Sequence, residues 1–444
     1  MAASFSVLAP PRAASGDRVG WPALDGVGLA LALAAFARRA GGPVLVAAAD
    51  GYSARRLRDD LNQLDGPQAE LFPDLEILPY DLYSPHPDLI SRRLEVLTGL
   101  PARRDGIVIV PVSALMQRLA PRSWLLGRNI DLHVGQDLDL SGFRAQLGDA
   151  GYTLADQVWQ PGQFALRGAV FDLWPMGCDE PYRMELFDTE IESIRTFDPD
   201  DQRSTGRLDA VRLLPGREYP FDEAARSDFR RRFRNRFDID LRHAVPYQEV
   251  GEGIHSQGLE QYLPLFFDST SSLLDYLPEP HRLVVLDGVE AAAAEFSEQV
   301  AFRHDQRQGD RQRPVLDPHE LFFDAGELID ALKTDCAVQV TRRAPARATL
   351  DTPPTLDLDQ APDNAADLLS GAGRVLLAAD TAGRRELIHA NLKRAGLTPK
   401  MIESWSAFVS GDAPLALAVL PFSSGCRLAD DGITILTEAE LFPG

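Results

Sequence analysis

Along residues 21–120, stretches with helical signals alternate with short apolar stretches that predict strands, a pattern typical of a parallel α/β sheet. The apolar run at residues 27–37 predicts a helix. Because this run is too short to span a bilayer, we expect the helix to be buried inside the protein. Short apolar runs at residues 43–49 and 107–112 predict strands that are buried on both faces. Helical patterns separate these strands, so we expect strands and helices to alternate in one parallel sheet.

The pattern changes in residues 123–215, where few helical signals occur. Two β-rich runs, at residues 164–175 and 182–194, lie on either side of a turn and predict a hairpin. In the second run Arg183, Glu185 and Phe187 stand at alternate positions, so they share one face of the strand. This region therefore predicts an α+β insertion.

The rest of the chain returns to alternating helices and strands, interrupted by a Pro- and Asp-rich stretch that predicts a linker. We therefore expect a multidomain α/β protein with an inserted α+β domain and a small C-terminal α/β domain. The expected divisions are a first α/β domain at 1–122, the insertion at 123–215, a second α/β domain at 216–348, the linker at 349–364 and the small domain at 365–444.

The composition limits the classes of function. The 444 residues carry a formal net charge of -21, which opposes tight sequence-independent binding to nucleic acid. Three widely separated cysteines, Cys178, Cys336 and Cys426, exclude a disulfide framework or a cysteine zinc cluster and fit a reducing cytosol. The sequence contains neither a signal-peptide pattern nor a membrane-spanning run, so we expect a cytoplasmic protein without a membrane partner.

A parallel α/β fold suggests a search for a phosphate-binding loop before the first long helix. Such a loop needs glycines, a lysine for the phosphate oxygens and a Ser or Thr for magnesium. Gly26 and Gly28 are present, but no Gly-Lys-Ser/Thr follows them. A later strand ends at Asp287, like the strand that holds magnesium in nucleotide hydrolases, yet Gly288 replaces the usual glutamate. An ordinary packed loop and an ordinary surface acid are the favoured interpretations.

One basic run, at residues 228–243, interleaves arginines with phenylalanines. Such a run is compatible with nucleic-acid binding by cations and stacking, and also with an amphipathic helix. Phe229, Phe233 and Phe237 recur at helical spacing, which favours a helix with its phenylalanines in the core. Weak contacts of the solvated arginines with DNA stay open. The arginines considered for them are Arg231, Arg232 and Arg234. No catalytic or metal-ligand constellation stands out in the sequence.

Several long motifs occur in order along the chain. They are LPYDLYSPHPDLISRRLEVL at 78–97, VPVSALMQRLAP at 110–121, GYTLADQV at 151–158, FALRGAVFDLWPMG at 164–177, PYRMELFDTEIESIRTFD at 181–198, RLLPGREYP at 212–220 and GLEQYLPLFF at 258–267. Together they resemble the N-terminal part of the bacterial transcription-repair coupling factor (Mfd) family. The same segments are more distantly similar to the excision-repair helicase subunit UvrB.

The resemblance implies a UvrB-homology module with domains 1a (1–122), 2 (123–215) and 1b (216–348), followed by domain 3 (365–444). It also implies a degenerate P-loop-like fold in which Asp287 and Gly288 are remnants of a nucleotide site. ATP hydrolysis, RNA polymerase binding and translocation on double-stranded DNA would belong to later domains. The chain is then expected to be a truncated N-terminal portion without catalytic residues, cofactor or metal of its own, and ATP and magnesium would serve only the missing domains.

In this family, domain 2 is the docking surface for the excision-repair protein UvrA. The family's binding positions correspond here to Arg167, Arg183 and Phe187, so the resemblance implies recruitment of UvrA to RNA polymerase stalled at DNA damage. We expect Arg183 and Phe187 to point to solvent. The alternative for the hairpin is a core position for Phe187, and the alternative for the whole chain is an active UvrB-like ATPase or helicase subunit.

Overall fold

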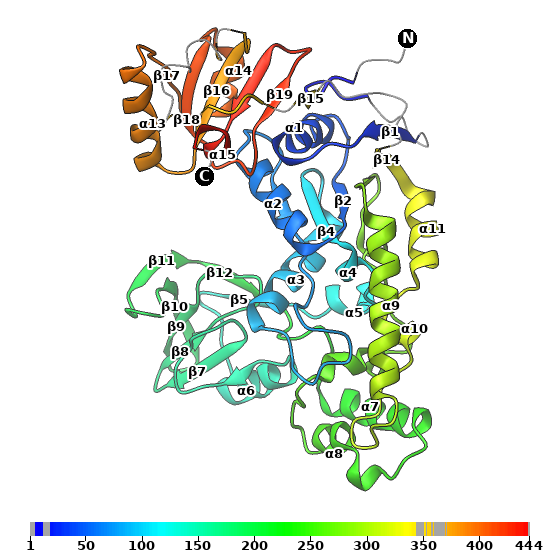
Figure 1. Cartoon of the computed structure of the whole chain (residues 1–444). Helices are drawn as coiled ribbons and strands as arrows, with labels where there is room; N and C mark the ends of the chain where they lie inside the picture. The colour runs from blue at the N-terminus through cyan, green and yellow to red at the C-terminus, as the bar shows by residue number, and fades with distance from the viewer. Residues whose placement is uncertain are drawn as a thin grey trace.

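The computed structural model describes residues 5–11, 18–342, 350–351, 353–356, 358, 369 and 371–442. Figure 1 shows a parallel sheet near the middle of the molecule, an antiparallel sheet that projects to one side, and a mixed sheet that contains the C-terminus. The predicted α/β multidomain fold with an inserted sheet is confirmed at this level. No helix among these described ranges combines the length and the apolar character needed to cross a membrane.

The central sheet has six strands in the order β1-β14-β13-β2-β4-β3, and all its neighbours are parallel. The strands are β1 (Val19–Pro22), β2 (Val44–Ala48), β3 (Ala69–Leu71), β4 (Ile107–Pro111), β13 (Arg282–Val285) and β14 (Cys336–Thr341). Strands β13 and β14 lie between β1 and β2, so segments on both sides of the insertion build one sheet. Continuous apolar runs form β2 and β4 because helices cover both faces of a parallel sheet.

The buried helix predicted at residues 27–37 is α1 (Gly26–Ala37). The other helices of the first part are α2 (Gly51–Asn62), α3 (Pro87–Gly99), η1 (Leu100–Ala102), α4 (Val112–Leu115) and α5 (Arg122–Leu126). Helix α1 is buried on all sides because it lies between the central sheet and the C-terminal sheet (Figure 1). Asp50 starts α2 by accepting a hydrogen bond from the backbone N–H of Ser53 at 2.7 Å.

The projecting sheet has the strand order β11-β10-β9-β8-β7-β6. Its elements and their neighbours are β5 (Ile130–His133), α6 (Leu140–Asp149), β6 (Thr153–Leu154), β7 (Gln163–Arg167), β8 (Val170–Leu173), β9 (Tyr182–Phe187), β10 (Glu190–Phe197), β11 (Ser204–Leu208) and β12 (Ala210–Leu213). The predicted single hairpin is wrong in one respect, because each of its two runs folds into two strands. Gly168 and Asp188, with φ of +63° and +56°, supply the left-handed backbone of the extra turns.

Residues beyond 216 form a second, mostly helical cluster besides β13 and β14. Its elements are α7 (Glu223–Arg236), η2 (Leu241–His243), α8 (Val245–Gly251), η3 (Leu259–Phe266), η4 (Leu274–Tyr276), α9 (Val289–Arg307), α10 (Pro318–Leu321) and α11 (Ala325–Asp335). Helices α7 and α8 share an aromatic core with η3, at the end of α9 that is distant from the central sheet (Figure 1). The predicted second α/β domain is therefore split between this helical cluster and the central sheet.

The C-terminal sheet has the order β15-β19-β20-β16-β18-β17 and mixes parallel with antiparallel pairs. Its elements are β15 (Leu350–Asp351), β16 (Arg374–Ala379), α13 (Ala382–Arg394), β17 (Lys400–Met401), α14 (Trp405–Ser410), β18 (Leu415–Val419), β19 (Cys426–Leu428), β20 (Ile433–Leu436) and α15 (Glu438–Leu441).

The described part of the predicted linker 349–364 belongs to this C-terminal unit. Strand β15 pairs with β19, and the backbone N–H groups of Leu356 and Leu358 donate to the carbonyls of Glu440 and Leu441 at 2.7 and 3.1 Å. Both leucine side chains are buried in the core of the unit. Leu356 and Leu358 therefore pack on the C-terminal unit, because their apolar side chains and backbone groups find partners there. The remaining linker residues lie outside the described residues.

Candidate functional site

The face of the antiparallel sheet that points away from its core, here called the outer face, carries the three predicted docking residues. Met184 and Leu186 of β9 point into the core, so Arg183, Glu185 and Phe187 share the outer face, as predicted. The strand register places Asp172 of β8 directly opposite Arg183. A buried carboxylate and an arginine thus meet across neighbouring strands.

Asp172 anchors two of the predicted residues. Its side chain is only 1% exposed, and its Oδ2 lies 2.6 Å from Nη2 of Arg167. Arg183 contacts the same carboxylate with two nitrogens, Nε to Oδ1 at 2.7 Å and Nη2 to Oδ2 at 2.9 Å. The guanidinium of Arg183 also lies over the ring of Phe197, 4.3 Å from its centroid. The hydrogen bonds that Arg183 donates to Asp172 raise the pKa of Arg183, so its guanidinium stays charged.

The three predicted residues differ in exposure. Phe187 is 75% exposed, so the alternative of a core position is wrong. The side chain of Arg167 is 49% exposed and that of Arg183 only 18%. The expectation that Arg183 points to solvent is therefore wrong, because Asp172 and Phe197 hold its guanidinium against the sheet.

Sequence reasoning missed Asp172 as a functional residue. A lone carboxylate between Phe171 and Leu173 was a local signal for it, since an acid inside an apolar strand needs a partner. The partner itself depends on the register of β8 against β9, which the intervening turn and the core decide. The pairing of β9 with β10 and of β10 with β11 brings two further arginines into one row with Arg183. They are Arg195 of β10, opposite Arg183, and Arg207 of β11, opposite Arg195.

The predicted remnants of a nucleotide site lie along the end of the central sheet where β1, β13 and β14 finish. Asp287 follows β13, and its Oδ2 lies 3.2 Å from Nε of Arg342 just after β14. Gly288 has φ of +86° and leads directly into α9. The carboxylate therefore faces a cation of its own chain, and the next position has no side chain to position water.

The start of α1, where a phosphate loop was sought, is covered by the C-terminal unit. A Cβ placed on Gly26 would lie 1.8 Å from Oγ of Ser424, in the loop between β18 and β19. The neighbouring Ser423 donates its backbone N–H and its hydroxyl to the buried Asp60 of α2, at 2.7 and 2.5 Å. Burial raises the pKa of Asp60. We call this contact region the closed edge.

Apolar packing continues across the closed edge. Residues of α1 and the C-terminal sheet belong to one hydrophobic cluster, and Ser406 donates its backbone N–H to Asp65 at 2.8 Å. A buried carboxylate and a shared core hold the two units together.

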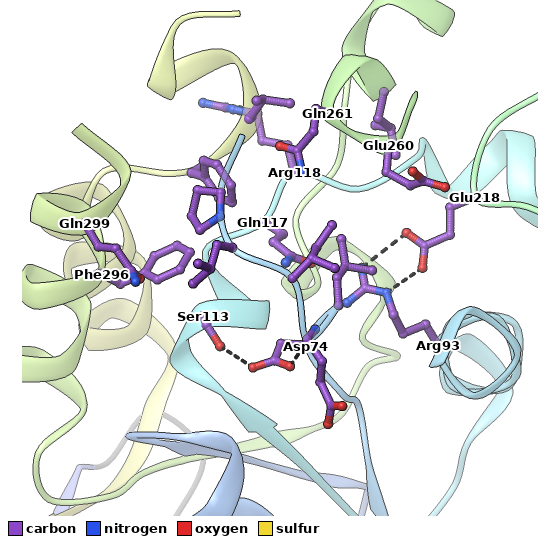
Figure 2. A pocket seen from close by; sticks show the side chains of 18 residues that line it. Asp74, Arg93, Ser113, Gln117, Arg118, Glu218, Glu260, Gln261, Phe296 and Gln299 are labelled. Atoms are coloured by element: carbon purple, nitrogen blue, oxygen red, sulfur yellow. Dashed lines mark hydrogen bonds and ion pairs between the residues drawn. The ribbon is translucent and has the colours of Figure 1, made fainter. Parts of the chain in front are cut away.

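A cavity of about 290 Å³ lies between the loop after β3, α3, α9 and η3 (Figure 2). Arg93 points from α3 toward Glu218, with Nε 2.5 Å from Oε1, and also donates to the carbonyl of Pro73 at 2.8 Å. Asp74 accepts from the hydroxyl of Ser113 at 2.9 Å. These groups satisfy one another, so their arrangement explains stability at this junction.

The basic run forms α7 in the way that the phenylalanine spacing favours. Phe229 and Phe233 are fully buried and Phe237 nearly so. Two of the three arginines considered for DNA are engaged with acids, Arg231 with Asp228 at 2.7 Å and Arg232 with Asp268 at 2.6 Å. Arg234 is exposed and takes part in no ion pair within the described ranges. Two of the three arginines considered for DNA are therefore compensated by acids of the chain itself.

The described part of the chain contains no group of three or more His, Cys, Asp or Glu side chains that could hold a metal ion. At the end of the central sheet and in the cavity, the charged groups Asp287 and Arg93 are paired with residues of the chain itself. The outer face of the antiparallel sheet is therefore the best candidate for a functional site.

Comparison with known proteins identifies the family. Residues 130–219 match a family model described as the UvrB interaction domain, and residues 368–441 match one described as the MFD, D3 domain. The first range contains β7 to β10 and all three predicted docking residues.

Curated relatives extend the similarity over most of the chain. The transcription-repair-coupling factor of Escherichia coli (strain K12) is 37% identical over 394 residues, covering 85% of this chain and 34% of that protein. The protein of the same name from Haemophilus influenzae is 35% identical over 387 residues, covering 84% and 34%. That of Bacillus subtilis is 30% identical over 281 residues, covering 60% and 24%.

The chain spans about a third of the length of the first two relatives. It belongs to the transcription-repair-coupling factors (Mfd) of transcription-coupled repair, as an N-terminal region with a UvrB interaction domain and an MFD D3 domain.

Proposed function

We propose that this chain recruits UvrA to RNA polymerase stalled at DNA damage, and that UvrA docks on the outer face of the antiparallel sheet. The observation that carries the proposal is the exposed Phe187 on the same face as two arginines held by one buried carboxylate. This face lies in the segment that matches the UvrB interaction domain.

Phe187 has the properties of an interface anchor. A phenylalanine ring that is three-quarters exposed contributes little burial energy to the stability of the fold. Aromatic side chains and arginines are enriched among the residues that dominate binding energy at protein interfaces. Arg167 has the matching polar role, because its guanidinium is half exposed and can still pair with a carboxylate of the partner.

Asp172 prepares this surface for binding. It holds Arg167 and Arg183 in place before a partner arrives, so less side-chain entropy is lost on association. Arg183 supports the site from below, since only a fifth of its side chain reaches solvent. We therefore assign direct contact to Phe187 and Arg167, and a positioning role to Arg183.

The same proposal assigns no ATPase activity to these residues. Gly26 and Gly28 lack the following lysine, and Asp287 is paired with Arg342 instead of being free for magnesium. ATP, magnesium, RNA polymerase and double-stranded DNA are engaged by the remainder of the full-length protein, and any DNA contact of Arg231, Arg232 and Arg234 is weak. A UvrB-like ATPase or helicase subunit is the alternative, and magnesium-dependent ATP turnover by this chain would support it.

The direct test is a titration of UvrA with the chain and its Phe187→Ala variant. Truncating an anchor of this kind costs on the order of 2 kcal/mol, so we expect affinity to fall roughly 30-fold with an unchanged melting temperature. Phe302→Ala is the matched control, because Phe302 is 63% exposed on α9. Equal affinities of the wild type and both variants would show that UvrA does not dock through Phe187.

A further inference from the structure

We propose that the docking surface extends from Arg183 across β10 and β11 through Arg195 and Arg207, and that it receives an acidic patch of the partner protein. The inference rests on the proposed docking of UvrA and adds the chemistry of the contact. Nothing in the local sequence pattern singles out Arg195 or Arg207, because both follow the second predicted run at residues 182–194 and only the strand register aligns them with Arg183.

The register of the sheet aligns these side chains in one row. Arg183 is paired with Arg195, and Arg195 with Arg207, so the three arginines stand side by side on adjacent strands. Neighbouring strands are about 4.8 Å apart, so the row is roughly 10 Å long. Phe187 lies four residues along β9, roughly 13 Å from Arg183. The surface thus has an apolar end and a cationic arm at right angles to each other.

The positive charge of the row increases toward β11. Arg183 is neutralised by the buried Asp172, and Arg195 lies 3.4 Å from Glu185, both of these side chains being about two-fifths exposed. Arg207 is exposed and takes part in no ion pair among the residues that the structure describes. It is available to an external anion.

An acidic protein surface fits this row better than a nucleic acid. Glu185 lies beside Arg195, and Glu190 is paired directly with Phe187, so phosphates that track along the face would meet carboxylates. The fork of an arginine matches the geometry of a carboxylate, and an exposed phenylalanine needs an apolar pocket. A protein partner supplies both, whereas duplex DNA offers no such pocket.

The test compares two charge reversals in UvrA titrations at low and physiological salt. Arg207→Glu should weaken binding on the order of tenfold, mainly through slower association, and should reduce the salt dependence. Arg234→Glu is the control, because Arg234 is also exposed and has no ion-pair partner in the described part of the chain. It should leave affinity and salt dependence unchanged. Thermal melts of both variants should match the wild type, because neither side chain takes part in an ion pair among the described residues.

The outcomes separate this inference from the proposed function. If the wild type does not bind UvrA, or if Phe187→Ala binds as well as the wild type, the proposed docking fails and the extension fails with it. If Phe187→Ala weakens binding while Arg207→Glu behaves like Arg234→Glu, only the extension is wrong. If Arg207→Glu instead weakens binding to a short DNA duplex and spares UvrA, the row is a nucleic-acid contact and the proposal is overturned.

Discussion

The outer face of the antiparallel sheet and the closed edge of the central sheet both gather charged side chains, yet they expose them differently. On the outer face, Asp172 holds Arg167 and Arg183 while part of each guanidinium and most of Phe187 stay in solvent. At the closed edge, Ser423 donates a hydrogen bond to the buried Asp60, and Ser424 covers the start of α1 at Gly26. The contacts of Asp172 hold side chains in place on an exposed surface, whereas the contacts of Ser423 and Ser424 cover the surface formed by α1 and α2.

This difference shows why a sheet edge typical of nucleotide-binding folds carries no evident function here. Ligands of open α/β sheets usually bind beyond the carboxyl ends of the strands. In this chain that edge is occupied by Arg342 on Asp287 and by the loop with Ser423 and Ser424. On the projecting sheet, Gln202 accepts a hydrogen bond from Arg183 at 2.8 Å, while Phe187 and half of Arg167 stay in solvent and are available to a partner.

Among the variants that test this difference between the two regions, we expect Arg183→Ala to have the largest effect on stability. This change leaves the buried Asp172 with Arg167 alone, and removal of one partner of a buried ion pair costs about 3 kcal/mol or more. Urea unfolding should show this loss, and UvrA affinity should fall as well. Arg207→Ala is the control, with a change within about 0.5 kcal/mol, as for other exposed positions. Unfolding of Arg183→Ala at the wild-type urea concentration would show that the pair does not stabilise the sheet.

At the closed edge, Gly26→Ala should cost about 2 kcal/mol. Its φ of +48° disfavours any side chain, and the new Cβ would clash with Ser424. Gly41→Ala is the matched control, because its φ is +73° but nothing lies within 4 Å of a Cβ there. It should cost only about 1 kcal/mol.

A Ser424→Gly background tests the origin of that difference. Removing the hydroxyl should reduce the cost of Gly26→Ala and leave the cost of Gly41→Ala unchanged, since contacting residues couple and distant ones do not. Urea unfolding of the three single and two double variants measures this coupling. Equal costs of Gly26→Ala in both backgrounds would mean that the loop does not close over α1.

Asp60→Ala should destabilise the closed edge by about 1 to 2 kcal/mol, because two donors of Ser423 lose their buried acceptor. Asp65→Ala removes an exposed acceptor of Ser406 and should cost less than about 0.5 kcal/mol. Proteolysis of the C-terminal unit and urea unfolding compare the two variants. Equal losses would show that burial of Asp60 does not matter.

The pH dependence of Asp60 has a definite sign. Burial raises its pKa in the folded chain, so the folded state takes up a proton before the unfolded state as the pH falls. Between the raised value and 3.8, the contribution of Asp60 to stability therefore grows with acidity. Unfolding measured for the wild type and Asp60→Asn from neutral pH down to pH about 4 should shift in favour of the wild type. A constant difference would contradict the burial effect.

The smallest expected effect is that of ATP with magnesium, which should leave the melting temperature of the chain unchanged. A ligand that binds the folded chain at a hundred times its Kd would add about 2.7 kcal/mol of stability. Thermal melts with and without magnesium measure this. A stabilisation that disappears with EDTA would reveal a nucleotide site at the closed edge or beside Asp287, despite Ser424 and Arg342.

Much of the fold follows from local patterns. Apolar runs gave the strands β2 and β4 and the buried helix α1 to within a residue or two at each end, because a strand or helix that is covered on both sides must be apolar throughout. Alternation also placed Arg183 and Phe187 on one face of β9. Two turns were missed, since Gly168 and Asp188 are weak turn signals when no second turn residue accompanies them.

The sequence by itself determined which residues had to be buried, which could not form a phosphate loop, and which strand would present Phe187. Tertiary structure alone decided that Asp172 holds Arg183, that Arg195 and Arg207 continue the row, and that Ser423 reaches Asp60. The physical reason is that burial and turn preference act on neighbouring residues. Strand register and the packing of distant segments depend on the whole core, and no local pattern encodes them.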